Sequence, residues 1–314
     1  MNSHPTQLAD MYVHRDRCPV CDAPRSAAKP VMRSRPPAES LPFDALGVFH
    51  SGYDSRRVFF SYYRCAVCAG LYCPTYLSPA QLDLLYSDQP ENMAEVPIAA
   101  REATLRVYFS ILRRHCVLDG EYLELGPDIG LFAQLCADAG RFERLHLFEP
   151  NRHVHSALAE RLAGQNVHIS AGTGDDNRPA DGNVSVAVAI HVIDHLIEPA
   201  SVLRGLHAAI KPGGTLFIVT HDEASLLARL LGKRWPPYTL QHPQLFAPHS
   251  IATLLERCGF AIVESAKTAN YFPVAHLVRS AFTVLGRERW APRYDHPFMI
   301  RIKLGNIVTV ARRI

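Results

Sequence analysis

Hydrophobic positions from about residue 98 onward follow two alternating patterns. Short apolar runs, typical of buried strands, are separated by segments in which apolar residues recur at helical spacing, as in Leu131, Phe132, Leu135 and Cys136. The predicted strands are 121–125, 144–148, 167–170, 184–190, 215–220, 260–265 and 307–311. This alternation predicts an α/β fold, with a seven-stranded, mostly parallel sheet and helices on both faces.

A glycine-containing turn, GPDIG, follows the first predicted strand. Gly126 and Gly130 lack a Cβ atom, so the backbone there can approach a ligand closely. The second strand ends in Glu149, whose carboxylate can accept hydrogen bonds from both hydroxyls of a ribose. Because doubly wound sheets bind ligands at the carboxyl ends of their strands, these features predict a site for an adenosine-like group. A nicotinamide dinucleotide fits less well, since the turn lacks the second glycine of G-x-G-x-x-G.

Two C-x-x-C pairs stand in the N-terminal part, Cys18 with Cys21 and Cys65 with Cys68. This spacing lets two tight turns present four sulfurs to one tetrahedral Zn²⁺, and a redox pair or chance pairing are the alternatives. A four-sulfur zinc site has no open position, so the ion would be structural rather than catalytic. Cys73 is expected to be a buried small side chain.

The N-terminal part is expected to end near residue 95. A capping-box sequence beginning at Ser78 predicts a short helix, and residues 88–97 show little periodicity, as in a linker. The predicted organisation is a small zinc-ribbon-containing domain over residues 1–95 and a larger α/β domain over residues 96–314. Alternating aromatics such as Phe59, Phe60 and Tyr62 favour packed ribbon strands over a basic, aromatic binding face.

Composition narrows the class of protein. The chain has 314 residues, with 48% hydrophobic and 20% charged side chains, which excludes a wholly disordered, fibrous or membrane-spanning protein. The net charge of +3 does not favour nucleic acid as a partner. Residues 233–314 hold 12 basic and 4 acidic side chains, so an anionic substrate or a solvated basic surface is expected there. Without a recognisable signal or spanning segment, a cytoplasmic location is expected; oligomeric state is not predicted.

The order of the motifs carries a resemblance to a known family. The motifs are CPVC, YRCAVCAGLY, LELGPDIG, LFEPN, HVIDHLIEP, IKPGGTLFIVT, LGKRWPPYTLQHPQLFAPHSIATLLERCGF and GNIVTVARR. Over most of its length the chain resembles class I S-adenosylmethionine-dependent methyltransferases, in particular a bacterial group with an N-terminal zinc ribbon. The resemblance implies a Rossmann-like seven-stranded methyltransferase sheet and S-adenosylmethionine as the cofactor.

The resemblance also implies roles for individual residues. Glu124, Gly126 and Gly130 would shape the loop that binds the methionine part, and Glu149 would hold the ribose. The adenine would lie near Asp175 or Asp176, and His191 beside the cofactor. Asp128 occupies the middle glycine of the family's E-x-G-x-G-x-G pattern, so a displaced loop or a weakly held cofactor is an open alternative.

His191, Asp194 and His195 follow the fourth strand at positions i, i+3 and i+4, which share one face if the segment is helical. Three roles are open for this trio: a general base, a divalent-metal site, or structural support of the loop. Ubiquinone-pathway O-methyltransferases and small-RNA 2′-O-methyltransferases hold a divalent ion with acidic and histidine residues in a similar place.

An aromatic segment follows the fifth strand, where this fold commonly builds a substrate wall. It contains Trp235, Tyr238, His242 and Phe246. His242 is a second candidate base, because a histidine can take a hydroxyl proton at neutral pH. Apolar packing is the alternative explanation of the aromatics.

The expected function is methyl transfer from S-adenosylmethionine to a small hydroxylated or sugar-like metabolite, with an anionic or carrier-linked form of it as an open option. Two alternatives stay open. One is an RNA methyltransferase that uses the ribbon for recognition, and the other is a noncatalytic binding or scaffold protein that retains the fold, suggested by Asp128. The acceptor atom is not predicted.

Overall fold

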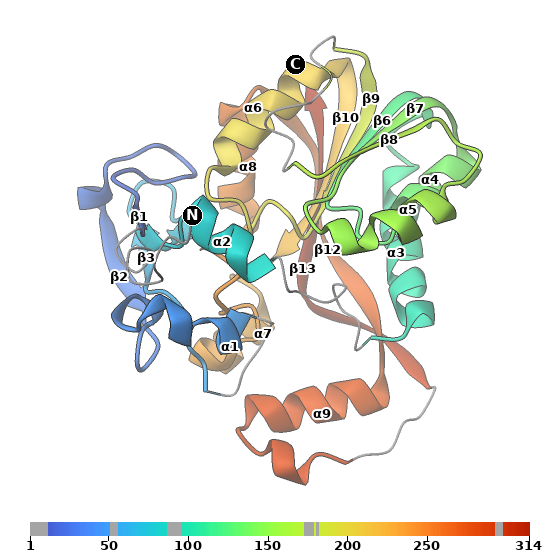
Figure 1. Cartoon of the computed structure of the whole chain (residues 1–314). Coiled ribbons are helices and arrows are strands. Elements are labelled where there is room, and N and C mark those ends of the chain that lie inside the picture. Colours follow the sequence, from blue (N-terminus) through green and yellow to red (C-terminus); the bar gives the residue numbers. More distant parts are fainter. Residues whose placement is uncertain (1–11, 51–55, 87–95, 173–178, 180–181, 293–297) are drawn as a thin grey trace, which may run out of the picture.

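A computed structural model describes residues 12–50, 56–86, 96–172, 179, 182–292 and 298–314. In it a large twisted sheet with helices on both faces lies beside a smaller N-terminal module (Figure 1). The expected boundary near residue 95 falls at the edge of residues 87–95, which lie outside the described part.

The large sheet has the order β12-β13-β10-β9-β6-β7-β8. Its strands are β6 (Asp119–Leu125), β7 (Arg141–Phe148), β8 (Val167–Ser170), β9 (Val184–Ile190), β10 (Ile210–His221), β12 (Phe260–Pro273) and β13 (Met299–Arg313). All neighbours from β10 to β8 pair in parallel, whereas β13 is antiparallel to both β10 and β12. The predicted seven-stranded, mostly parallel sheet is confirmed.

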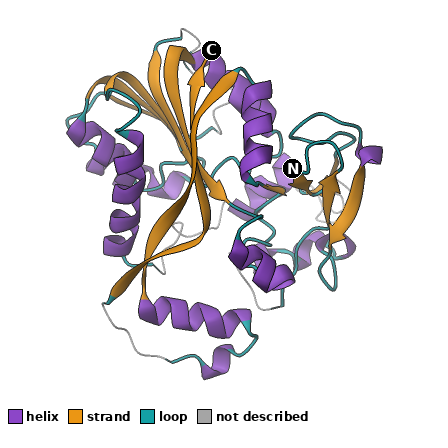
Figure 2. Ribbon diagram, turned by 180° about the vertical axis from the view of Figure 1, so that it is seen from behind, coloured by secondary structure: helices purple, strands orange, loops and turns teal. Residues whose placement is uncertain are grey.

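Helices cover both faces of this sheet, as Figure 2 also shows. One face carries α3 (Ile98–Leu112), α4 (Leu131–Ala139) and α5 (His155–Arg161), and the other carries α6 (Pro199–Ala209) and α8 (Pro248–Arg257). The central strand β9 is buried and almost entirely apolar, with the sequence VSVAVAI, because helices cover it on both sides.

Strands β12 and β13 continue beyond the sheet as a two-stranded arm (Figure 1). The predicted strands 260–265 and 307–311 are therefore only the inner parts of longer strands. The arm carries α9 (Val274–Val284) at its tip, followed by the short 3₁₀ helix η7 (Glu288–Trp290). Periodicity alone missed the extension because its side chains are mostly only half-buried.

The N-terminal module contains two small sheets. β1 (Val13–His14) pairs with β5 (Thr75–Tyr76), and β2 (Ala28–Met32), β3 (Tyr62–Cys65) and β4 (Leu71–Tyr72) form an antiparallel ribbon. Its short helices are α1 (Gly47–His50) and α2 (Pro79–Tyr86), together with the 3₁₀ turns η2 (Arg25–Ala27), η3 (Ala38–Ser40) and η4 (Phe43–Ala45). The predicted capping box begins α2: the backbone N–H of Ser78 donates to the Gln81 side chain, and that of Gln81 donates to the Ser78 hydroxyl.

The ribbon gains a fourth strand from the larger part of the chain. Strand β11 (Gln244–Leu245) pairs with β4, so that residues about 170 positions apart along the chain share one sheet. The segment leading to β11 includes α7 (Leu226–Leu231) and η6 (Gly232–Arg234). The small module and the aromatic segment after β10 therefore form one packed unit.

Aromatic side chains fill the core of that unit. The Phe59 and Tyr238 rings stack with centroids 5.5 Å apart, and Trp235 is buried against Tyr238. Phe60 and Tyr62 are also buried, as expected for packed ribbon strands. At the edge of the core, Arg64 forms a two-pronged ion pair with Glu223, at 2.8 and 2.9 Å. Among the described residues, no helix is both long and apolar enough to cross a membrane.

Candidate functional site

The turn after β6 depends on its two glycines. Gly126 has a φ of +64°, and a Cβ atom there would lie 2.7 Å from Cγ2 of Val192. Gly130, with a φ of +79°, precedes α4, and a Cβ atom there would lie 2.5 Å from Cδ1 of Leu158. Both positions combine a left-handed backbone with close packing, so glycine is required at each.

Asp128 occupies the turn without disrupting it. Its φ is +52°, a left-handed conformation that aspartate tolerates better than most residues. Its carboxylate lies 3.4 Å from the Arg101 guanidinium of α3, and its backbone N–H donates to Glu149 at 2.9 Å. The departure from the glycine pattern is therefore accommodated, with the turn tied to the end of the neighbouring strand.

Glu149 stands directly after β7 and is 7% exposed. One carboxylate oxygen accepts from the backbone N–H of Asp128 and the other from that of Asn151, at 2.9 and 2.8 Å. Burial raises the pKa of Glu149, while these two N–H groups oppose the rise. A carboxylate oxygen has more than one lone pair, so both oxygens can still accept a hydroxyl hydrogen each.

Glu124, near the end of β6, is 2% exposed and accepts a 2.7 Å hydrogen bond from the Tyr122 hydroxyl. Burial raises the pKa of Glu124 to about 8, and the charge of Glu149 adds to the rise. Glu124 is thus mostly protonated at neutral pH, when it can also donate a hydrogen bond. Asp175 and Asp176, expected near the adenine, lie outside the described residues.

The segment after β9 is a turn rather than a helix, so His191, Asp194 and His195 do not share a helical face. The turn divides them. His191 and Asp194 come together with His221, their donor atoms all within 4.8 Å of one another. His195 instead packs its ring against His242, with centroids 4.5 Å apart.

Two histidines of this cluster were missed from the sequence. His221 is the last residue of β10, and its ring lies 4.6 Å from that of His191. The rule that ligand-binding groups gather at the carboxyl ends of neighbouring parallel strands could have found it. His50, from α1, is fully buried, and burial together with the charge of His195 lowers its pKa to about 4. No local signal pointed to His50, since only the packing of the two modules brings it there.

His242 has a defined proton arrangement. Its Nδ1 lies 2.7 Å from the Pro237 carbonyl oxygen, which can only accept, so Nδ1 carries the hydrogen and Nε2 is an acceptor. Nε2 is buried and has no hydrogen-bond partner among the described residues. Burial also lowers the pKa of His242 well below its usual value, which favours the neutral ring.

The other expected wall residues, Trp235, Tyr238 and Phe246, are buried in packed cores. Apolar packing therefore explains these aromatics. His242 joins the histidine cluster, where its ring centroid lies 5.2 Å from that of His221. The Trp235 ring also meets His221 edge-on, with centroids 6.3 Å apart.

The turn that carries Asp194 and His195 is held by Gln244 of β11. The Gln244 amide nitrogen donates to the carbonyls of Ile193 and Leu196 at 3.0 and 2.7 Å. The Gln244 amide oxygen accepts from Arg15, whose guanidinium also donates to the Ile197 carbonyl at 2.7 Å. Residues of the small module and the β11 segment thus fix the turn from outside the large sheet.

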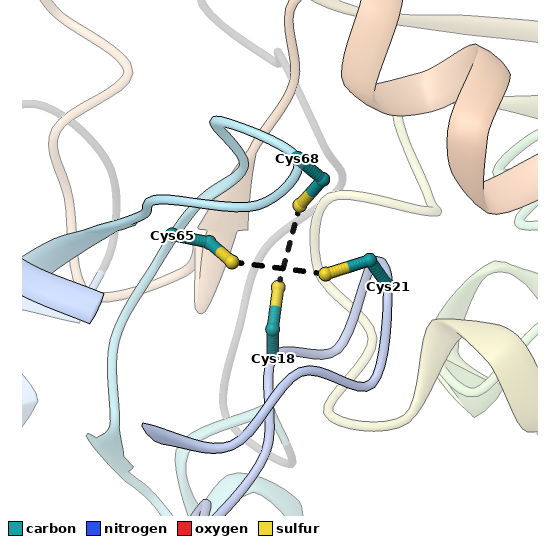
Figure 3. Close-up of side chains that lie close together, drawn as sticks. All are labelled: Cys18, Cys21, Cys65 and Cys68. Carbon is teal, nitrogen blue, oxygen red and sulfur yellow. Dashed lines mark hydrogen bonds between the residues drawn. The ribbon is translucent and has the colours of Figure 1, made fainter. Parts of the chain in front are cut away.

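The four paired cysteines converge (Figure 3). Sγ of Cys18 lies 3.6 Å from that of Cys68, and Sγ of Cys21 lies 3.7 Å from that of Cys65. Four sulfurs at about 2.3 Å from one tetrahedral ion would be about 3.8 Å apart, so the group is compatible with zinc. Cys73 lies outside this group and is fully buried, as expected.

Residues 99–265 match the protein family described as "Methyltransferase domain". The chain belongs to this methyltransferase domain family. Within the methyltransferase domain lie the glycine turn, Glu149 and the histidines after β9 and β10.

Two ubiquinone biosynthesis O-methyltransferases are similar to this chain. That of Aeromonas salmonicida is 29% identical over 98 residues, covering 29% of this chain and 41% of the relative. That of Aromatoleum aromaticum is 25% identical over 130 residues, covering 38% and 50%. The chain therefore matches half or less of the length of these relatives.

Two solved structures share the fold of the methyltransferase domain. A Haloferax volcanii methyltransferase in complex with the Trm112 activator has a TM-score of 0.53 at 14% identity, covering 73% of this chain and 96% of that chain. A Bacillus halodurans methyltransferase has a TM-score of 0.50 at 14% identity, covering 66% and 98%. At such low identity the likeness concerns the fold alone.

The buried carboxyl group of Glu124 gives a test by pH. The folded state keeps the Glu124 proton up to about pH 8, whereas the unfolded chain loses it near pH 4.5, so stability falls as pH rises between these values. The loss is on the order of 1 kcal/mol per pH unit. Glu124→Gln should flatten this part of the curve in urea unfolding at pH 5 to 8, and the exposed-site control Glu143→Gln should not. Parallel curves for Glu124→Gln and the unsubstituted protein would contradict the assignment.

Proposed function

We propose that this protein transfers a methyl group from S-adenosylmethionine to a hydroxyl oxygen of a small molecule. The observation that carries the proposal is that the glycine turn and the histidine cluster lie side by side. The glycine turn after β6 packs directly on Val192, in the turn that bears the histidine cluster, so a cofactor site and acid–base groups adjoin each other. The family and the similar O-methyltransferases support the reaction class.

The residues of the β6 turn fit the cofactor. Gly126 and Gly130 let the turn pack closely on Val192 and Leu158, and Glu149 keeps free lone pairs for ribose hydroxyls. Bound S-adenosylmethionine supplies an electrophilic methyl group on a sulfonium. The protein then has to align the acceptor oxygen with that methyl and take up the acceptor's proton.

His242 is the proposed base. With S-adenosylmethionine bound, the acceptor oxygen would bond the methyl carbon as the carbon–sulfur bond breaks and leaves its electron pair on sulfur. Nε2 of His242 would take up the hydroxyl proton. The Pro237 carbonyl fixes the tautomer that this step requires and accepts the Nδ1–H hydrogen bond of the resulting imidazolium. His195 packs on His242 and positions its ring. His191 remains beside the cofactor turn, since its neighbour Val192 contacts that turn.

An anionic or carrier-linked substrate is favoured by the charge of one groove. A groove of about 480 Å³ in the small module is lined by Arg25, Arg33 and Lys233, with Glu39 as its acidic residue. Glu39 is engaged by the Ser61 hydroxyl. We propose a small metabolite rather than nucleic acid as the substrate, because the net charge of +3 is low for a phosphate-tracking surface.

The proposed division of the chain is a zinc-ribbon domain over 1–95 and a methyltransferase domain over 96–314. Zn²⁺ held by the four cysteines would be structural, because four sulfurs fill its coordination. The backbone N–H of Gly70 lies 3.4 Å from Sγ of Cys68, a donor that stabilises a thiolate. The ion would hold together the turns that place Arg15 and β4 against β11.

The cofactor site is tested by Glu149→Ala. Loss of the hydrogen bonds that the ribose hydroxyls would donate to this carboxylate should weaken S-adenosylmethionine binding about 10-fold to 100-fold, measured by calorimetry. Glu143→Ala, at the opposite end of β7, is the matched control and should leave affinity unchanged. A titration of the unsubstituted protein that stays silent at millimolar cofactor would instead favour the noncatalytic scaffold.

The base is tested by His242→Ala. Turnover of an accepted substrate should fall about 100-fold or more, since general-base catalysis typically contributes that much, while cofactor affinity stays near the original value. His249→Ala, an exposed histidine on α8, serves as the control. Substrates can be found by incubating the protein with fractionated metabolites and methyl-labelled cofactor. A normal rate in a folded His242→Ala protein would show that positioning alone drives the reaction.

The proposed zinc site is tested by removing one sulfur. Cys18→Ser should lower bound zinc at the cysteine site and destabilise the small module, because a structural zinc supplies part of the folding free energy. Thermal unfolding and metal content by mass spectrometry provide the readouts, with Cys73→Ser as a control that leaves zinc content unchanged. Full stability after metal removal would contradict a structural ion.

A further inference from the structure

A second group of potential metal ligands lies at the carboxyl ends of β9 and β10. His191, Asp194 and His221 bring their donor atoms within 4.8 Å of one another. The site shares no residue with the cysteine group and differs from it chemically, with two imidazoles and one carboxylate instead of four thiolates. Such a mixed nitrogen and oxygen set is typical of divalent first-row transition metals.

The buried carboxylate of Asp194 has few hydrogen-bond donors around it. Asp194 is 0% exposed, and in the described part of the chain its Oδ1 has no hydrogen-bond partner. Its Oδ2 accepts a long 3.4 Å bond from the backbone N–H of His221. Burial raises the pKa of Asp194, but the charges of the neighbouring histidines lower it by more. A buried carboxylate needs a cation or several donors, and an incompletely paired one costs several kcal/mol. No arginine or lysine among the described residues forms an ion pair with it.

The His191 ring does not donate a hydrogen bond to this carboxylate in the described structure. Nδ1 of His191 is buried and, like Oδ1 of Asp194, has no hydrogen-bond partner among the residues the structure describes. The structure describes no hydrogen bond between the two side chains, although a donor atom of each lies within 4.8 Å of one of the other. Ligands that share an ion at about 2.0 to 2.2 Å are separated by roughly 3 to 4.4 Å. Donor atoms within 4.8 Å of one another are compatible with two ligands of one ion.

Asn306 of β13 orients both rings. Its Oδ1 lies 3.1 Å from Nδ1 of His221, so Nδ1 donates and Nε2 of His221 keeps its lone pair for a ligand. Its Nδ2 donates to Oδ1 of Asn270 at 3.0 Å and lies farther, at 3.4 Å, from Nε2 of His191. The Asn306 amide nitrogen can only donate, so Nε2 of His191 carries no proton. Because Asn306 is engaged more closely by Asn270, the lone pair of Nε2 can serve an ion. Amides that orient metal-binding histidines in this way are common around metal sites.

The backbone supports the same interpretation. His191 has a φ of +52°, a conformation uncommon for a residue other than glycine, which costs energy and is concentrated at functional sites. We propose that His191, Asp194 and His221 bind a divalent transition-metal ion. With three protein ligands the ion keeps open positions, in which it would hold the hydroxyl oxygen of the acceptor and ease loss of its proton to His242. This role rests on the proposed function, whereas the ion site does not.

Cobalt(II) is a suitable probe, because thiolate and nitrogen–oxygen sites give different absorption spectra. The full chain, stripped of metal and dialysed against Co²⁺, should bind about two ions, one with intense thiolate-to-metal absorption and one with weak bands only. His221→Ala and the nearly isosteric Asp194→Asn should each retain about one ion with the thiolate absorption unchanged. Cys18→Ser should lose the thiolate absorption and keep the weak bands, and the exposed control His249→Ala should keep both.

Asn306→Ala tests the orienting role separately. It should raise the dissociation constant of the second ion about 10-fold to 100-fold without abolishing binding. The proposal is overturned if the unsubstituted protein binds cobalt only at the cysteines, or if Asp194→Asn retains both ions. Neither readout uses the methyl donor, so a protein that binds the second ion but no S-adenosylmethionine would contradict the proposed function alone.

Discussion

The arrangement of the site depends on one buried amide, that of Gln244. Gln244 is fully buried on β11, where its side chain donates to carbonyls of the turn after β9 and accepts from Arg15 of the small module. A buried amide is favourable only when its polar atoms are paired, so these partners must be present together. The turn bearing Asp194 and His195 thus takes its shape from residues outside the large sheet.

Features set by local sequence could be predicted. The strands of the large sheet follow from apolar runs, because a strand covered by helices on both faces must be apolar throughout. The paired cysteines and the position of Glu149 at the end of β7 follow from spacing along the chain. The family match and the sheet order agree with the predicted fold.

Features that arise from packing between distant segments could not be predicted from the sequence. Nothing local shows that His50 would reach the histidine cluster, or that β11 would join the ribbon. The turn after β9 was considered as a helix because its spacing fits one, but Gln244 and Arg15 take the carbonyls 193, 196 and 197 that a continuing helix would use internally. That difference changed which residues meet: His221, not His195, lies with Asp194 and His191.

The strand shared through β11 also limits how the protein can be divided. Trp235 and Leu240 are buried in one core cluster with ribbon residues such as Phe59 and Tyr76. A chain cut near residue 96 would leave this apolar surface, and the free edge of β11, open to water, where such surfaces promote aggregation. The two modules are therefore not independent domains. Transplanting the ribbon onto another enzyme would require moving the β11 segment with it.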